Sequence, residues 1–166
     1  MMNKICIINT GGTFNKVYNP LTGELDIPKN SNALESIMIT FTKSYPIKEI
    51  LFKDSLEMKL NDRQEINSLV TLLKEEYHSI IIIHGTDTME LTAHHLADFE
   101  HNANIILTGA MVPYSIDSIE ATANFALALG FAKNCSKNGV YIAMQGDVAP
   151  HYHLKKNRTI GKFERV

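Results

Sequence analysis

The chain alternates short apolar runs with longer amphipathic segments. The apolar runs are nearly continuous and rich in β-branched residues, which is typical of strands buried on both faces of a parallel sheet. These runs are Ile5–Ile8, Ile80–Ile83, Ile105–Leu107 and Val140–Ala143. The pattern therefore predicts a sheet of mostly parallel strands.

Between these runs, apolar residues recur at the spacing of an amphipathic helix. One helix is expected behind the capping-box sequence Asp62–Glu65, with its inner face running from Ile66 to Tyr77. Two more are expected from near Thr88 to Phe99 and from Ser118 to Lys133. Strands that alternate with helices predict an α/β fold, here a three-layer, Rossmann-like or flavodoxin-like sandwich. No linker or repeat divides residues 1–166, so we expect a single domain.

A polar segment, Phe14–Ser31, directly follows the first predicted strand. It contains Pro, Gly and several Asn residues, which predicts a long loop. Because ligands in parallel α/β sheets bind outside the carboxyl ends of the strands, a loop that leaves this edge is well placed to act as a lid.

Composition narrows the class of protein. The 166 residues are 45% hydrophobic, and 16 basic against 18 acidic side chains give a net charge of -2, which argues against a nucleic-acid binder. The apolar runs are shorter than the roughly 20 residues of a membrane helix and the roughly 7–15 of a signal-peptide core. Two cysteines, Cys6 and Cys135, are too few for a disulfide framework. We therefore expect a cytoplasmic protein that acts away from membranes.

Three predicted strands end in the same kind of sequence. The segments Asn9–Thr13, His84–Thr88 and Thr108–Pro113 each combine hydroxyl side chains with glycine. Glycine lets backbone approach a ligand closely, and N–H groups at a following helix N-terminus can receive negative charge. Each segment alone is ordinary turn chemistry, but three at one sheet edge predict a site.

These segments resemble the bacterial-type L-asparaginase family. The first two, Thr10-Gly11-Gly12-Thr13 and His84-Gly85-Thr86-Asp87-Thr88, look like its two signature sequences, and Thr108-Gly109-Ala110-Met111 resembles a third. The resemblance covers nearly all of the chain but only the family's N-terminal domain. The usual smaller C-terminal domain, which completes a neighbouring subunit's pocket, has no counterpart in residues 1–166.

The resemblance implies a set of catalytic residues. Thr13 matches the nucleophile, and Thr86 and Asp87 match a proton-handling group that also contains a lysine. A Lys-x-Asn register selects Lys155 as that lysine, and because neighbours in an extended segment point to opposite faces, Lys156 is expected in solvent. Tyr18 is the available tyrosine of the lid.

The resemblance also implies substrate-binding residues. Ser55, in the sequence Ser55-Leu56-Glu57-Met58, resembles the residue that binds the substrate α-carboxylate. Asp87 would hold the α-ammonium, and the backbone of Ala110 would lie beside the leaving amide. The expected binding set is Gly12, Ser55, Glu57, Gly85, Thr86, Asp87 and Ala110.

The implied reaction converts L-asparagine and water to L-aspartate and ammonia through an acyl-enzyme on Thr13. It requires no cofactor, and the seven histidines are not spaced as a metal-ligand set, with His84 expected to support a turn. The resemblance also implies a homo-oligomer, at least a dimer. Two alternatives stay open: a glutaminase or other small-amide hydrolase, and an inactive amino-acid-binding domain.

Overall fold

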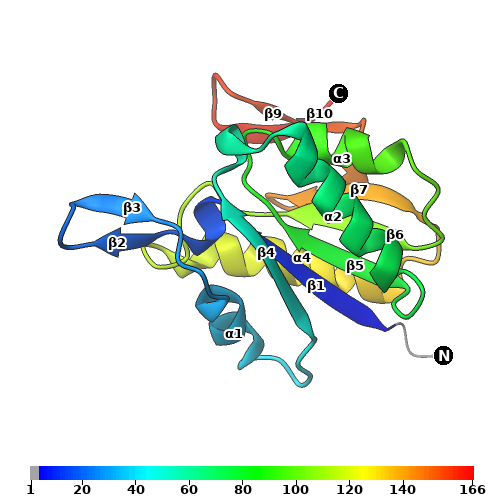
Figure 1. The fold of residues 1–166 in the computed structure, drawn as a ribbon, viewed down its shortest axis with the longest axis horizontal. Coiled ribbons are helices and arrows are strands. Elements are labelled where there is room, and N and C mark those ends of the chain that lie inside the picture. The colour runs from blue at the N-terminus through cyan, green and yellow to red at the C-terminus, as the bar shows by residue number, and fades with distance from the viewer. Residues whose placement is uncertain (1–3) are drawn as a thin grey trace.

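The computed structural model describes residues 4–166 as a central sheet with helices on both faces (Figure 1). Its six strands lie in the order β4-β1-β5-β6-β7-β8, and β8 is antiparallel to β7 while the other pairs are parallel. The strands are β1 (Ile5–Gly11), β4 (Ile47–Lys53), β5 (Ser79–Ile83), β6 (Asn104–Thr108), β7 (Gly139–Met144) and β8 (Asp147–Pro150). The predicted α/β class is confirmed. After β1, the chain places β4 on one side of it and then places β5, β6, β7 and β8 on the other side. This is the flavodoxin-type strand order.

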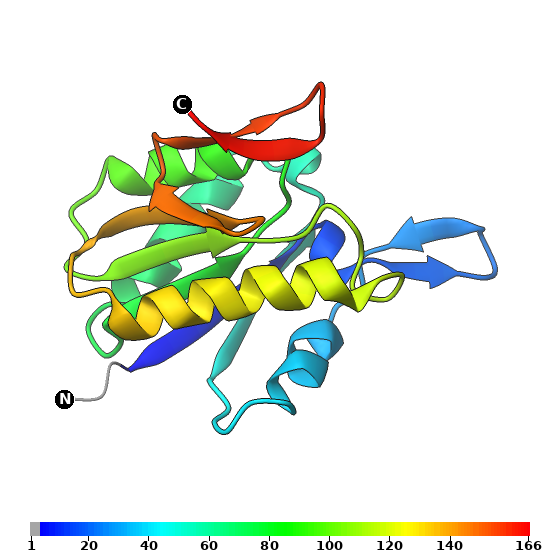
Figure 2. The same ribbon diagram turned by 180° about the vertical axis from the view of Figure 1, so that it is seen from behind.

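Helices cover the two faces of the sheet as separate layers (Figure 2). Successive side chains of a strand point to opposite faces, so Ile80 and Ile82 pack against one layer and Ile81 and Ile83 against the other. The first layer contains α2 (Leu60–Leu73) and α3 (Met89–Ala97), and the second contains α1 (Asn32–Met38) and α4 (Ser118–Asn134).

The helix expected behind Asp62 begins two residues earlier, at Leu60. Asp62 lies in its first turn, where its carboxylate accepts the Lys59 N–H at 2.8 Å and pairs with the Lys53 ammonium at 2.7 Å. The acidic side chain therefore satisfies a free N–H at the helix start, as predicted, but from within the helix.

The segment predicted as a long loop is a projecting β-hairpin. After a 3₁₀ turn, η1 (Thr13–Asn15), strands β2 (Val17–Asn19) and β3 (Glu24–Asp26) pair antiparallel, with Tyr18 opposite Leu25. Figure 1 shows the hairpin extending away from the body of the molecule. Of the residues that suggested a loop, Pro20 and Gly23 lie in the turn of this hairpin and Pro28 and Asn30 in its return segment. Asn15 belongs to η1 and Asn19 to β2.

A second hairpin follows β8. Strands β9 (Leu154–Asn157) and β10 (Lys162–Arg165) pair antiparallel, and Leu154 and Phe163 pack into the core on the α2–α3 side of the sheet. This packing fixes which residues of β9 face the interior. Within residues 4–166, the helices are too short or too polar to cross a membrane.

Candidate active site

The first two glycine-containing turns are in direct backbone contact. A Cβ atom on Gly12 would lie 2.5 Å from the backbone nitrogen of Gly85, and one on Gly85 would lie 2.6 Å from the Ser55 hydroxyl oxygen. Gly12 also has a φ of 73°, which L side chains rarely adopt. Glycine is therefore required at position 12 to bring the ends of β1 and β5 together, and at position 85 to let Ser55 approach.

The end of β4 bends to join this contact. Leu51 and Phe52 have φ angles of 68° and 49°, a left-handed conformation that is unusual for large side chains. Directly after them, the Lys53 carbonyl accepts the Gly12 N–H at 2.9 Å. A 3₁₀ turn, η2 (Ser55–Glu57), follows and carries Ser55 against Gly85. The unusual backbone thus lies where three segments of the site meet.

A lysine, a threonine and an aspartate form the polar centre of the site. The Lys156 ammonium donates to Thr86 Oγ1 at 2.9 Å and to Asp87 Oδ1 at 2.8 Å. The Lys156 side chain is only 9% exposed, and that of Asp87 is 32% exposed. Burial strengthens such a pair because water screens it less.

The prediction that Lys155 faces the pocket and Lys156 faces solvent is wrong. Lys155 is exposed, whereas Lys156 reaches Thr86 and Asp87. Neighbouring side chains of β9 do point to opposite faces. Leu154 is fully buried, and this determines which of the following residues point inward. Because side chains two apart in a strand share a face, Lys156 points inward with Leu154.

His84 supports the second turn, as expected. The ring is fully buried, its Nδ1 lies 2.7 Å from the Gly85 carbonyl, and its Nε2 lies 2.7 Å from the Thr92 hydroxyl. These partners assign the N–H to Nδ1, because the carbonyl can only accept. Burial lowers the pKa of His84 to about 4, so the ring is neutral near pH 7.

Thr13 opens the η1 turn beside this centre. Its backbone carbonyl accepts the Lys16 N–H at 3.1 Å, and its side chain is partly exposed. Because Gly12 packs on Gly85, residues 13 and 86 follow two backbones in contact. Tyr18, in contrast, lies on the outer hairpin, where it is 62% exposed and its hydroxyl makes no hydrogen bond with the residues that the structure describes.

An ion pair joins the root of the hairpin to η2. The Lys16 ammonium lies 2.7 Å from Asp54 Oδ2, and Asp54 Oδ1 accepts the Leu56 N–H at 3.1 Å. Burial alone would raise the pKa of Asp54, but these hydrogen bonds more than offset it and hold the pKa below its ordinary value. Glu57 is exposed and, with Lys16 and Asp54, lines an open hollow of about 540 Å³.

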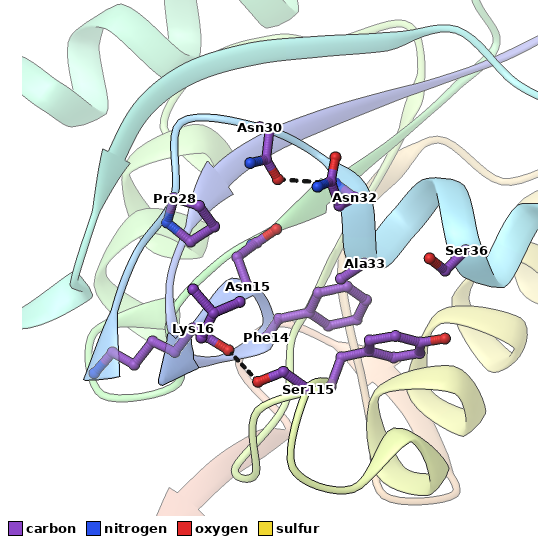
Figure 3. A pocket seen from close by; sticks show the side chains of 11 residues that line it. Phe14, Asn15, Lys16, Pro28, Asn30, Asn32, Ala33, Ser36 and Ser115 are labelled. Carbon is purple, nitrogen blue, oxygen red and sulfur yellow. Dashed lines mark hydrogen bonds between the residues drawn. The ribbon is translucent and has the colours of Figure 1, made fainter. Parts of the chain in front are cut away.

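A second hollow, of about 270 Å³, lies on the α1 side of the η1 turn (Figure 3). The buried residues Phe14 and Asn15 line its inner wall, and the exposed residues Asn32 and Ser36 of α1 line its rim. Neither this hollow nor the larger one has Thr13 or Thr86 in its wall. Thr13 and Thr86 therefore lie outside both hollows.

The third glycine-containing segment is held from both sides. Ala110 is buried, and the Gly109 carbonyl accepts an amide N–H of Asn124 at 2.9 Å. The Glu120 carboxylate accepts the backbone N–H groups of Met111 at 3.1 Å and Val112 at 3.0 Å. These two N–H groups are thereby occupied, a role of Glu120 that sequence reasoning missed.

Arg158 was also missed. Its guanidinium donates to the Asp87 carbonyl at 2.7 Å and lies 3.8 Å from Asp87 Oδ1. Side-chain alternation gives no signal for Arg158, because this residue lies in the turn after β9.

Three other expected residues, Ser55, Gly12 and Gly85, meet at one point. There Ser55 is fully buried and its hydroxyl accepts the Thr88 N–H at 3.3 Å.

The fold and site define an α/β domain with polar residues gathered beyond the carboxyl ends of a parallel sheet, where the strand order reverses. Residues 4–162 match the family described as asparaginase, N-terminal, and the chain belongs to that family. It is thus a homologue of asparaginase- and glutaminase-type amidohydrolases.

Three relatives illustrate the breadth of the family. The chain is 27% identical over 161 residues to an L-asparaginase of Thermococcus kodakarensis and 25% identical over 158 residues to a glutaminase-asparaginase of Acinetobacter glutaminasificans. It is 31% identical over 157 residues to one subunit of a glutamyl-tRNA(Gln) amidotransferase of Methanococcus vannielii. The matches cover 95%, 88% and 89% of this chain, respectively.

A solved structure of the thermostable L-asparaginase from Thermococcus kodakarensis superposes with a TM-score of 0.85 at 27% identity. The superposition covers 98% of this chain and 51% of that one. The chain spans 49%, 47% and 35% of the length of the three relatives, in the order L-asparaginase, glutaminase-asparaginase and amidotransferase subunit. It therefore corresponds to about half of these proteins or less.

Proposed function

We propose that this chain carries the catalytic half of an L-asparaginase-type amidohydrolase, with Thr13 as the nucleophile. The observation that supports the proposal most strongly is the Lys156 ammonium, held at 2.9 Å from Thr86 and 2.8 Å from Asp87 beside the Thr13 turn. A threonine hydroxyl needs an adjacent proton-handling group to attack an amide at neutral pH, and these three residues supply one.

In the proposed reaction, the Thr13 hydroxyl oxygen bonds to the side-chain amide carbon of L-asparagine and gives up its proton. That proton passes through the Thr86–Lys156 group to the amide nitrogen, and ammonia leaves as the carbon–nitrogen bond breaks. Water then attacks the Thr13 ester, which releases L-aspartate and restores the hydroxyl. Backbone N–H groups at the glycine turns would stabilise the oxyanion in both steps.

The residues expected to bind the α-ammonium and the α-carboxylate of the substrate differ in how accessible they are. Asp87, with Glu57 at the rim, offers negative charge for an α-ammonium, although Lys156 and Arg158 already neutralise part of it. The resemblance assigns the α-carboxylate to Ser55, whose hydroxyl is closed off, so binding there requires η2 to move. We propose that the hairpin carrying Tyr18 closes over the bound substrate, as a lid does.

A glutaminase is the second candidate, because a relative of comparable similarity is named a glutaminase-asparaginase. An inactive amino-acid-binding domain is the third, because the chain spans only part of its relatives' length. We further propose a cytoplasmic setting, in keeping with two free cysteines, and an assembly of at least two copies.

Ammonia release separates these candidates. The purified chain is assayed with asparagine, glutamine and buffer alone, and Thr13→Ala is compared with Thr22→Ala, a change in the exposed hairpin turn. We expect release from asparagine that Thr13→Ala abolishes and Thr22→Ala retains. Mass spectrometry should show an acyl adduct in the wild type and in Thr22→Ala but not in Thr13→Ala. Release from glutamine alone would favour the second candidate. A thermal shift by aspartate without any release would favour the third.

A further inference from the structure

A separate hollow of about 260 Å³ opens at the other edge of the sheet, where β6 and β7 begin. It lies between the end of α3, the turn that precedes β7 and the end of β8, away from the carboxyl ends that carry the candidate active site (Figure 2). We call it the aromatic pocket, and its main lining residues are Phe99, His101, Lys137, Tyr141, His151 and Tyr152.

The walls of the aromatic pocket expose aromatic side chains to solvent. Phe99 is 46% exposed and Tyr152 is 53% exposed, although both are large aromatic side chains. The Phe99 and His101 ring centroids lie 6.4 Å apart, and those of His151 and Tyr152 lie 5.2 Å apart. Exposed rings gathered around a hollow form a surface on which another planar ring can stack.

The His101 imidazole lines the same pocket. Both ring nitrogens of His101 are closed off from solvent, and a hydrogen bond with the Leu96 backbone opposes part of the lowering of its pKa. Burial, reinforced by the positive charge of Lys74, lowers the pKa of His101, so the ring is neutral near pH 7. A neutral ring of this kind adds to the aromatic wall of the pocket.

The charge at the rim is positive. The Lys137 ammonium has no partner within the described chain, while its backbone carbonyl accepts the Tyr141 hydroxyl at 3.0 Å. The residues that line the pocket include no aspartate or glutamate. An uncompensated ammonium beside ring faces favours a ligand that combines an aromatic plane with an anionic group.

We propose that the aromatic pocket binds a small aromatic acid. Its ring would stack between Phe99 and Tyr152, beside the His101 ring, and its carboxylate would face Lys137. The volume suits a ligand of one or two rings. This site is independent of Thr13 and of the proposed hydrolysis, so its test requires no activity.

Nicotinate and nicotinamide are matched probes, because they share a ring with a polar nitrogen and differ in charge. Titration of the full chain with each is followed by the Cε1–H proton signals of its histidines, with His101→Gln assigning one signal. We expect saturable shifts of the His101 and His151 signals, with nicotinate binding about fivefold more tightly than nicotinamide.

Variants test each part of the proposal. Lys137→Met should remove the preference for nicotinate, while Lys29→Met, which changes an exposed lysine elsewhere, should keep it. Tyr152→Ala should weaken both probes by a similar factor. The proposal fails if neither probe shifts the His101 signal to saturation, if both bind equally to the wild type, or if Lys137→Met leaves the preference intact.

Discussion

At the scale of single residues, the site depends on one ammonium held between a hydroxyl and a carboxylate. Replacing Lys156 by Met keeps the side-chain length and removes the charge that contacts Thr86 and Asp87. If Lys156 carries the proton, kcat should fall by about 10²–10⁴-fold, the usual contribution of a general acid or base. Steady-state ammonia release measures this change.

Lys155→Met is the matched control, because Lys155 is the exposed neighbour on the same strand. It should leave kcat within about twofold of the wild type, as expected for a surface charge. A larger loss from Lys155→Met than from Lys156→Met would show that the ion pair is structural and that the proton travels by another route.

Lys156 also shows what could not be predicted from the sequence for a single residue. A dipeptide such as Lys155-Lys156 offers two registers, and the motif alone selected the wrong one. The nearest apolar residue, Leu154, resolves the choice because it is buried in the core and fixes the inward phase of β9. The pairing of Thr86 with Asp87 was predictable, since their order in the chain does not depend on a distant contact.

His84 gives the protein a pH-dependent stability. Its pKa is lowered from 6.5 to about 4 by burial, so the unfolded chain binds a proton that the folded chain excludes. The free energy of unfolding should therefore have its full value above pH 6.5 and should fall by on the order of 3 kcal/mol as the pH drops to 4. Urea unfolding at pH 7.5, 6 and 4.5 measures this decline.

His84→Gln separates this histidine from His101 and His151, whose pKa values are also lowered by burial. The variant should be less stable at pH 7.5, because it loses the ring contacts to Gly85 and Thr92. Its stability should, however, decline less between pH 6.5 and 4 than that of the wild type. If the wild type and His84→Gln lose the same stability over this pH range, a group other than His84 causes the decline.

At the scale of elements, the contact between the ends of β1 and β5 is a tight constraint on the site. Gly12 and Gly23 share a φ of 73°, but only Gly12 has backbone atoms in the space of a Cβ. Gly23→Ala should cost about 1–2 kcal/mol, the penalty of the left-handed conformation. Gly12→Ala adds a backbone clash and should cost several kcal/mol more, which chemical denaturation measures.

Gly12→Ala should also lower the rate of ammonia release, since separating β1 from β5 moves residue 13 away from residue 86. Gly23→Ala should leave that rate nearly unchanged. If both variants lose the same stability, the Gly12–Gly85 contact is looser than described and the two turns can move apart at little cost.

Some elements were harder to predict than others. The continuous aliphatic runs of β1, β5, β6 and β7 were recognised because strands buried on both faces need no polar residues. Strand β4 was missed because it lies at the sheet edge, where Lys48 and Glu49 are exposed. The hairpin β2–β3 was taken for a loop because its short strands are mostly exposed and polar.

At the scale of the whole molecule, one surface suggests association. The outward side of α4 carries exposed apolar or small residues at helical spacing, namely Ile119, Ala123, Ala126 and Gly130. A helix that is apolar on all sides is usually covered. We expect a solution mass of at least about 37 kDa, twice the 18.6 kDa of the chain.

Light scattering measures this mass. Ala126→Glu, which places a charge in the middle of the exposed α4 side, should shift the mass toward that of one chain. Leu21→Glu, at a position that is 94% exposed in the hairpin turn, should leave the mass unchanged. A mass of one chain for the wild type would contradict the expectation of a dimer.

The distance along the chain between Lys156 and its partners also bears on how the protein is made. Lys156 meets Thr86 and Asp87 across 70 and 69 residues. A ribosome exposes β1, β5 and β6 well before it delivers β9, and these parallel strands can pair among themselves. The nascent chain can therefore adopt its sheet while Asp87 still lacks its ammonium partner, and the polar centre is completed on a scaffold that has already folded.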